Sequence, residues 1–146
     1  MSAEANAAAA RRVTEEAFNE GRLEVIDELC SPDIVTHDPA EPEDLKGTEV
    51  LKERVARYRT AMSDLRVTFE DVFATEDRVA ARWKAAGTND GELAGMPATG
   101  KKMEITGNSI DRFDSDGKIV ETWDNWDNAG FMAQLGITPE MAGQAG

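Results

Sequence analysis

The sequence is poor in the residues that build covalent or metal-bound frameworks, with one cysteine and one histidine in 146 residues. Cys30 has no partner for an internal disulfide. It follows Leu29 at the end of an apolar helical pattern, so we interpret it as a buried structural thiol. One Cys and one His would need several carboxylates to complete a metal site, and no ligand spacing supports one. We therefore predict no metal, and no sequence motif indicates a cofactor.

Long hydrophobic runs and basic residues are also scarce. No stretch of about 18 apolar residues is present, so we predict no membrane span. Segment 1–13 lacks the basic start and apolar core of a signal peptide, which makes a cytoplasmic location the default expectation. The 29 acidic residues outnumber the 16 basic ones, and a net charge of −13 disfavours nucleic acids and anionic membranes as partners. Because the acids are dispersed and lysines are few, we also hypothesise a halophilic source.

What the sequence does contain is a helical first half and a strand-rich second half. The absence of a repeat or a Pro/Gly-rich linker indicates a single domain over residues 1–146. The spacing of apolar residues predicts three helices, the first of them ended by Gly21. These helices span residues 3–20, 22–30 and 48–62. Between the last two, residues 34–37 are expected to be extended and residues 40–45 to form a surface loop.

After residue 62 the hydrophobic period changes to two, the period of a strand. Two segments alternate in this way, 67–73 and 79–85. They predict a hairpin in which Phe73 pairs with Val79 and Phe69 with Trp83.

A second hairpin, 101–113 with 118–126, is predicted around the turn 114–117. Asp127 follows it in the position of an N-cap for a short helix ended by Gly136. Helices followed by antiparallel strands indicate an α+β class. A strongly curved sheet of this kind wraps its helices and leaves a pocket at its open end.

Several segments, in order along nearly the whole chain, resemble the SnoaL-like polyketide cyclase family. They are VTHDP (35–39), GMPATGK (95–101), IDRF (110–113), DGKIVETWD (116–124) and QLG (134–136). The resemblance implies an NTF2-like cone, with N-terminal helices packed in a strongly curved antiparallel sheet, and a homodimer. It also implies aldol-type ring closure without metal or cofactor, with an aspartate as general base.

The strand 118–126 carries the candidate base. Thr122, Asp124 and Trp126 share one of its faces and Trp123 lies on the other, and the resemblance places the family's aspartate just after Trp123. We therefore predict that Asp124 faces the pocket, because a carboxylate in an apolar cavity loses hydration and its pKa rises toward that of a general base. Trp126 would then offer a flat wall to a planar substrate.

The register of the second hairpin decides which residues join Asp124. If Phe113 pairs with Ile119, Asp124 lies opposite Asn108, which could bind a developing enolate. The family, as matched here, has a His near this position, so an Asn departs from its pattern. The same register adds Ile110, opposite Thr122, and Arg112 to the face of Asp124.

Four further residues complete the candidate site. His37, the only histidine, has an ordinary pKa near ~6.5 and could donate or accept a proton; the alternative is a half-buried His bonded to a backbone carbonyl. Asp127 competes with Asp124 as the catalytic carboxylate, although an N-cap is the more ordinary role. Tyr58 and Trp83 are expected in the core or on the cavity floor.

Three functions fit these residues. The first is cofactor-free general-base chemistry, either aldol-type cyclisation or isomerisation, on a small hydrophobic carbonyl compound. The second is a non-catalytic module that binds or carries a small molecule in the same pocket. The third is hydrolysis of an epoxide, with Arg112 beside Asp124. The fold alone does not choose among them.

Overall fold

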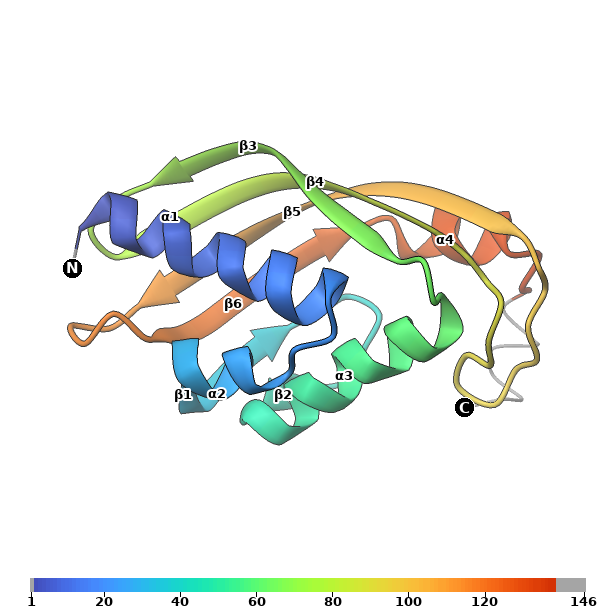
Figure 1. The fold of residues 1–146 in the computed structure, drawn as a ribbon, viewed down its shortest axis with the longest axis horizontal. Helices are drawn as coiled ribbons and strands as arrows, with labels where there is room; N and C mark the ends of the chain where they lie inside the picture. The colour runs from blue at the N-terminus through green and yellow to red at the C-terminus, as the bar shows by residue number, and fades with distance from the viewer. Residues whose placement is uncertain (1, 139–146) are drawn as a thin grey trace.

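The computed structural model describes residues 2–138, in which a curved sheet wraps around helices (Figure 1). The helices are α1 (Ala3–Arg12), the π-helical segment η1 (Val13–Asn19), α2 (Glu24–Leu29), α3 (Thr48–Ala61) and α4 (Asn128–Gln134). The strands are β1 (Cys30–His37), β2 (Leu45–Lys46), β3 (Arg66–Ala74), β4 (Arg78–Thr88), β5 (Lys102–Phe113) and β6 (Ile119–Trp126). The predicted α+β class is confirmed.

The alanine-rich first segment forms one continuous helical stretch, as predicted. Ser2 caps α1, since its hydroxyl accepts a hydrogen bond from the backbone N of Ala5 at 3.1 Å. The stretch passes into η1 and ends at Gly21, whose φ of +77° is one that a side chain disfavours. Its buried face includes Ala10 and Ala17, small residues that let the helix lie close to the sheet.

The six strands are arranged in the order β2-β1-β6-β5-β4-β3. β1 runs parallel to β6, and every other neighbouring pair is antiparallel. The long strands β3 to β5 bend over α1, while α2 and α3 lie on the same concave side of the sheet (Figure 1). α4 packs against β5 at the far end. No helix within residues 2–138 is long and apolar enough to cross a membrane.

A bulge in β3 shifts the first hairpin by one residue. Phe69 pairs with Trp83 as predicted, but Asp71 pairs with Arg82, so one residue of β3 has no partner at this point. Beyond the bulge, Phe73 pairs with Ala80, and the predicted pairing of Phe73 with Val79 is wrong. The shift turns Phe73 to the outer face, where 72% of its surface is exposed.

A second bulge shifts the last hairpin. Phe113 pairs with Ile119 as predicted, but the next pair is Arg112 with Glu121, which leaves Val120 as the extra residue. From there on every partner differs by one from the predicted register. The expectation that Asp124 lies opposite Asn108 is therefore wrong.

Two clusters of buried apolar residues fill the concave side. One gathers around Met62, Leu65, Phe131 and Leu135, at the end of the sheet near α4. The other joins α1, α2 and α3 to the sheet. Its buried members are Ala10, Ala17, Ile26, Cys30, Ile34, Leu51, Val55, Val79, Phe113 and Ile119. Phe18 packs against both clusters.

Candidate active site

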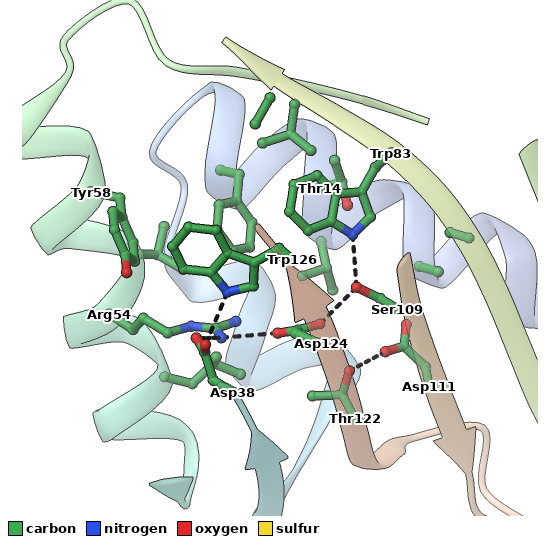
Figure 2. Close-up of a pocket in the computed structure, with 18 of the residues that line it drawn as sticks. Thr14, Asp38, Arg54, Tyr58, Trp83, Ser109, Asp111, Thr122, Asp124 and Trp126 are labelled. Atoms are coloured by element: carbon green, nitrogen blue, oxygen red, sulfur yellow. Dashed lines mark hydrogen bonds and ion pairs between the residues drawn. The ribbon is translucent and has the colours of Figure 1, made fainter. Parts of the chain in front are cut away.

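A cavity of about 160 Å³ lies on the concave side of the sheet and is lined by residues of both core clusters. Most of its wall is apolar, and a small set of polar side chains projects into it from η1, α3, β5, β6 and the residue that follows β1 (Figure 2). This combination of apolar walls and few polar groups is typical of a small-molecule site. Among the described residues, no three His, Cys, Asp or Glu side chains form a group that could hold a metal ion.

Arg54 of α3 is a buried cation that joins two carboxylates of the cavity. Its Nη1 donates to Oδ2 of Asp38 at 2.8 Å and to Oδ2 of Asp124 at 2.9 Å. Only 8% of the Arg54 side chain is exposed, and 2% and 14% of the two aspartates. Burial by itself would lower the pKa of Arg54, but the attraction of Asp124 and Asp38 outweighs it and raises that pKa. The three side chains together carry one net negative charge.

Hydrogen bonds extend this ion pair in both directions (Figure 2). Trp126 Nε1 donates to Oδ1 of Asp38 at 2.9 Å. On the other side, Ser109 Oγ donates to Oδ1 of Asp124 at 2.7 Å and accepts from Trp83 Nε1 at 2.9 Å. Each oxygen of Asp124 thus accepts one hydrogen bond, which fixes the plane of the carboxylate and leaves lone pairs available to a ligand.

Asp111 is a further cavity carboxyl and differs from Asp124 in forming no ion pair among the described residues. Within residues 2–138 its hydrogen-bond partner is Thr122, whose Oγ1 donates to it at 2.6 Å. Burial raises the pKa of Asp111 to about 7, and the charge of Asp124 adds to this rise; the bond from Thr122 and the charge of Arg54 oppose it. The cavity therefore contains a carboxylate paired with Arg54 and a carboxyl that is easily kept neutral.

Five of the predicted site residues line this cavity. They are Tyr58, Trp83, Thr122, Asp124 and Trp126. Tyr58, Trp126 and Phe131 meet edge to face, with ring centroids 5.6–6.2 Å apart, and form one aromatic wall. The structure thus places these side chains together, while their roles stay predictions.

The residues predicted from the wrong register lie on the outer face of the sheet. Asn108 is exposed and outside the cavity, and Ile110 is 44% exposed. Arg112 donates to Glu121 at 3.1 Å and does not share the face of Asp124. The reason in each case is the bulge at Val120, which shifts β6 by one residue, so that its even-numbered residues share the cavity face with the odd-numbered residues of β5 and not with the even-numbered ones.

His37 also lies outside the cavity. Its Nε2 is 2.6 Å from Glu121 and its Nδ1 is 2.9 Å from Asp44, and its ring stacks on Trp123 with centroids 5.4 Å apart. The hydrogen bond to Glu121, with that to Asp44, raises the pKa of His37 despite partial burial. The hydrogen-bond partners of the His37 ring are thus two carboxylates. They differ from the backbone carbonyl of the one expectation, and the ring does not line the cavity as the other expectation required.

Asp127 caps α4, as its position in the sequence predicted. Its Oδ1 accepts from the backbone N of Gly130 at 2.8 Å. The side chain is exposed and borders a second hollow that it shares with Asn108 and Asn125, and Asp127 is not among the residues that line the cavity. Its geometry therefore accounts for a helix cap and offers no contact with Asp124.

Sequence reasoning missed five polar residues of the cavity, namely Thr14, Asp38, Arg54, Ser109 and Asp111. The signal for the last two was present in β5, where the apolar Met103, Ile105 and Phe113 are all odd-numbered and buried. By period two, residues 109 and 111 share their face.

These observations define the class of protein before any comparison: an NTF2-like cone whose cavity contains aspartates and a buried arginine. The family model described as SnoaL-like polyketide cyclase matches residues 8–135. The chain belongs to this family. A search of curated proteins found no match.

Solved structures give the same result. IdmH of Streptomyces antibioticus, a proposed polyketide cyclase, is 34% identical, with 90% of this chain and 99% of that chain covered at a TM-score of 0.75. AclR of Streptomyces galilaeus, a proposed hydroxylase, is 29% identical, with 94% and 100% covered and a TM-score of 0.80. A proposed SnoaL-like polyketide cyclase from Jannaschia sp. CCS1 is 20% identical, with 93% and 94% covered; its TM-score of 0.83 concerns the fold alone.

Proposed function

We propose that this protein is a cyclase-type enzyme that uses Asp124 as a general base on a small hydrophobic carbonyl compound, with no cofactor. The observation that carries this proposal is the setting of the Asp124 carboxylate. It projects into a mostly apolar cavity, and Ser109 and Arg54 each hold one of its oxygens. A carboxylate oriented in this way is suited to take a proton from a carbon atom placed above it.

The chemistry follows from the groups around Asp124. The carboxylate removes a proton from the carbon next to a carbonyl, and the electron pair moves onto the carbonyl oxygen as an enolate. The enolate carbon then attacks a second carbonyl of the same molecule and closes a ring; the π electrons of that carbonyl move onto its oxygen, which takes up a proton and becomes a hydroxyl. Arg54 contributes positive charge close to the developing negative charge. Trp83 and Trp126 offer flat apolar surfaces that keep water away from the reactive carbon.

The size of the cavity supports a compact substrate. A volume of about 160 Å³ suits a compound with one or two rings better than a larger fused system. Its walls are lined by aromatic and aliphatic side chains, which favour an apolar ring over a charged or sugar-like ligand.

Two generic carbon acids test the base. They are 5-nitrobenzisoxazole, whose ring opens when a base takes its C–H proton, and 1-indanone, whose α-protons exchange in D2O. We expect Asp124→Asn to slow both reactions by about 100-fold or more, while Asp116→Asn, an exposed turn residue, leaves both unchanged. Equal rates for Asp124→Asn and the wild type would contradict the proposal. Binding of 1-indanone without catalysis of either reaction would favour the binding-module alternative.

Epoxide hydrolysis is a second candidate, favoured by the buried Asp38–Arg54–Asp124 arrangement. In this arrangement Arg54 supplies the positive charge that was predicted from Arg112, because Arg112 lies on the outer face of the sheet. Asp124 would take a proton from a water molecule while the oxygen of that water attacks an epoxide carbon. The alkoxide formed when the epoxide ring opens would then take up a proton. Hydrolysis of styrene oxide that is lost in Asp124→Asn, with no reaction of the two carbon acids, would favour this candidate.

We also propose a homodimer formed through the outer face of the sheet. Paired positions place a row of side chains across five strands on that face: Phe73, Ala80, Ile110, Trp123 and His37. The large exposed surfaces of Phe73 and Ile110 support burial against a second copy. Light scattering should give a dimer for the wild type and a monomer for the double variant Phe73→Glu/Ile110→Glu. A monomeric wild type would contradict this proposal.

A further inference from the structure

Of the three carboxyl groups of the cavity, Asp124 is the proposed base and Asp38 pairs with Arg54, which leaves Asp111 without a role. We propose that Asp111 is the proton donor of the reaction, and that it protonates the oxygen of the attacked carbonyl while Asp124 acts as base. This inference rests on the proposed function and assigns a second catalytic residue to the same site. It requires that the Asp111 and Asp124 carboxyls reach the same substrate and that Asp111 is protonated. It also requires that every proton removed in the reaction is accounted for.

The sheet register places the two carboxyls on one face of neighbouring strands. Asp111 of β5 pairs with Thr122 of β6, and Ser109 pairs with Asp124. Asp111 and Asp124 are therefore diagonal neighbours, a relation in which the two positions are ordinarily about 7–8 Å apart. Both line the cavity (Figure 2). A substrate lying across β5 and β6 would have one carboxyl near the carbon acid and the other near the second carbonyl.

Their surroundings give the two groups opposite charge states. Asp124 has Arg54 at 2.9 Å, whereas Asp111 has only the hydroxyl of Thr122 as partner within the described residues. Two other ionisable groups act on or face Asp111. The charge of Arg54 of α3 lowers its pKa without overcoming the rise. Cys30 of β1, whose pKa is raised to about 12 by burial and the nearby Asp111, remains a neutral thiol. Burial and the charge of Asp124 raise the pKa of Asp111 to about 7. Two carboxyls with such different environments are suited to act as a base and an acid.

The proton balance closes without any further reactant. The C–H proton passes to Asp124, and the electron pair forms the new carbon–carbon bond. The π electrons of the attacked carbonyl move onto its oxygen, which takes the proton of Asp111 and becomes a hydroxyl. The product is an isomer of the substrate. Asp124 is then protonated and Asp111 ionised, and transfer of one proton through cavity water restores both.

A purely structural role for Asp111 makes a different prediction. The side chain could serve only to accept the hydrogen bond of Thr122. Asn at this position keeps an oxygen that accepts the bond and has nearly the same shape, but it has no acidic proton. Asp111→Asn therefore removes the proposed chemistry and conserves the packing, and Asp111→Glu returns an acid to the same place.

The test compares two probes that need an acid to different degrees. Exchange of the α-protons of 1-indanone requires a base at carbon and is assisted by an acid at the carbonyl oxygen. The ring opening of 5-nitrobenzisoxazole requires the base, while its nitrophenolate is a good leaving group with little need of an acid. We expect Asp111→Asn to slow exchange by about 10- to 100-fold and ring opening far less. Asp111→Glu should recover part of the exchange rate.

The pH profile gives a readout that a structural role would not change. Because Asp111 must be protonated to act, the exchange rate of the wild type should fall as the pH rises above about 7. In Asp111→Asn the lower rate should no longer show this fall.

The outcomes separate the two proposals. If Asp124→Asn slows both probes but Asp111→Asn exchanges 1-indanone at the wild-type rate, the donor role is wrong and the general base stands. An equal loss on both probes in Asp111→Asn, without recovery in Asp111→Glu, would also overturn the donor role. If Asp124→Asn leaves both probes unaffected, the proposed function fails, and with it the role of Asp111.

Discussion

Arg54 creates the chemical difference between the carboxyl groups of the cavity. It lies within 2.9 Å of Asp38 and Asp124 and compensates one of their two charges. Asp111, on the next strand, forms no ion pair with Arg54, and burial with the charge of Asp124 raises its pKa more than Thr122 and the charge of Arg54 lower it. A guanidinium retains its charge even when buried, so this asymmetry persists over the pH range in which the protein is folded.

The half-buried Asp111 predicts a pH-dependent difference in stability between the wild type and Asp111→Asn. Its pKa is about 7 when folded, above the ordinary 3.8, so the folded wild type is progressively disfavoured as the pH rises from about 4 to 7. The variant lacks this titration. We expect the free energy of unfolding of Asp111→Asn, relative to wild type, to increase by about 2–4 kcal/mol across that range, since one pKa unit is worth about 1.4 kcal/mol.

Urea unfolding of both proteins at pH 5, 6, 7 and 8 measures this difference. Groups that titrate equally in the two proteins cancel in the comparison. A difference that stays constant with pH would show that Asp111 has an ordinary pKa in the folded state.

His37 offers a direct measurement of a raised pKa, because the chain has no other histidine. Its hydrogen bond with Glu121 is the largest cause of the rise, and Asp44 adds to it. The midpoint of the His37 ring-proton titration in NMR should therefore lie above the ordinary value near ~6.5. Glu121→Gln should lower the midpoint, and Asp44→Asn should lower it less. A wild-type midpoint at or below the ordinary value would show that these ion pairs do not persist in solution.

At the scale of elements, alternation of apolar residues predicted both hairpins, and bulges limited the accuracy of their register. Each bulge inserts a residue that differs in no evident way from its neighbours, so periodicity does not locate it. A shift of one residue moves side chains to the opposite face. Asn108 was thereby predicted in place of Ser109, although the odd-numbered apolar residues of β5 pointed to the correct face.

Arg54 of α3, the cation of the site, was not predicted, and the reason is different. Leu51 and Val55 marked the buried face of this helix, and Arg54 falls within the same arc. An arginine beside such a stripe ordinarily extends its end to solvent. Here Asp38 follows the end of β1 and Asp124 lies on β6, so only the folded arrangement brings to Arg54 the partners that allow its charge to be buried.

The cap of α4 predicts a measurable loss of stability without a loss of activity. Asp127→Ala removes the acceptor for the backbone N of Gly130 and should cost about 1 kcal/mol in urea unfolding, while Asp127→Asn should stay close to wild type. Neither change should alter the turnover of the two carbon acids, because Asp127 lies outside the cavity. A large loss of turnover in Asp127→Asn would restore it as a catalytic candidate.

For the whole molecule, the sequence predicted the class and the order of elements better than the site. Helix and strand periods are averaged over many residues, so single errors do not change the fold. The polar cavity depends on particular pairings among β1, α3, β5 and β6, in which one shifted residue exchanges Ser109 for Asn108. Of the predicted cavity residues, those on β6 were placed correctly because the parity of that strand was chosen from Asp124 itself.

The net charge of −13 predicts that salt stabilises the whole molecule. Mutual repulsion among dispersed acids disfavours the compact state, and ions screen it over distances of about 10 Å at 0.1 M. The buried pairs of Arg54 with Asp38 and Asp124 are screened much less, so salt should weaken the site little. We therefore expect the melting temperature to rise steadily as KCl increases from 0.05 to 1 M, by several degrees.

A variant with fewer exposed acids separates charge screening from a general effect of salt on hydrophobic burial. Glu20, Glu43, Glu53, Glu70 and Glu92 are exposed and form no salt bridge among the described residues. Replacing all five by Gln removes part of the repulsion, so this variant should melt above the wild type at 0.05 M KCl and gain less from added salt. Equal slopes for the two proteins would mean that the salt effect does not come from the acidic surface. No rise for the wild type would contradict the halophilic hypothesis.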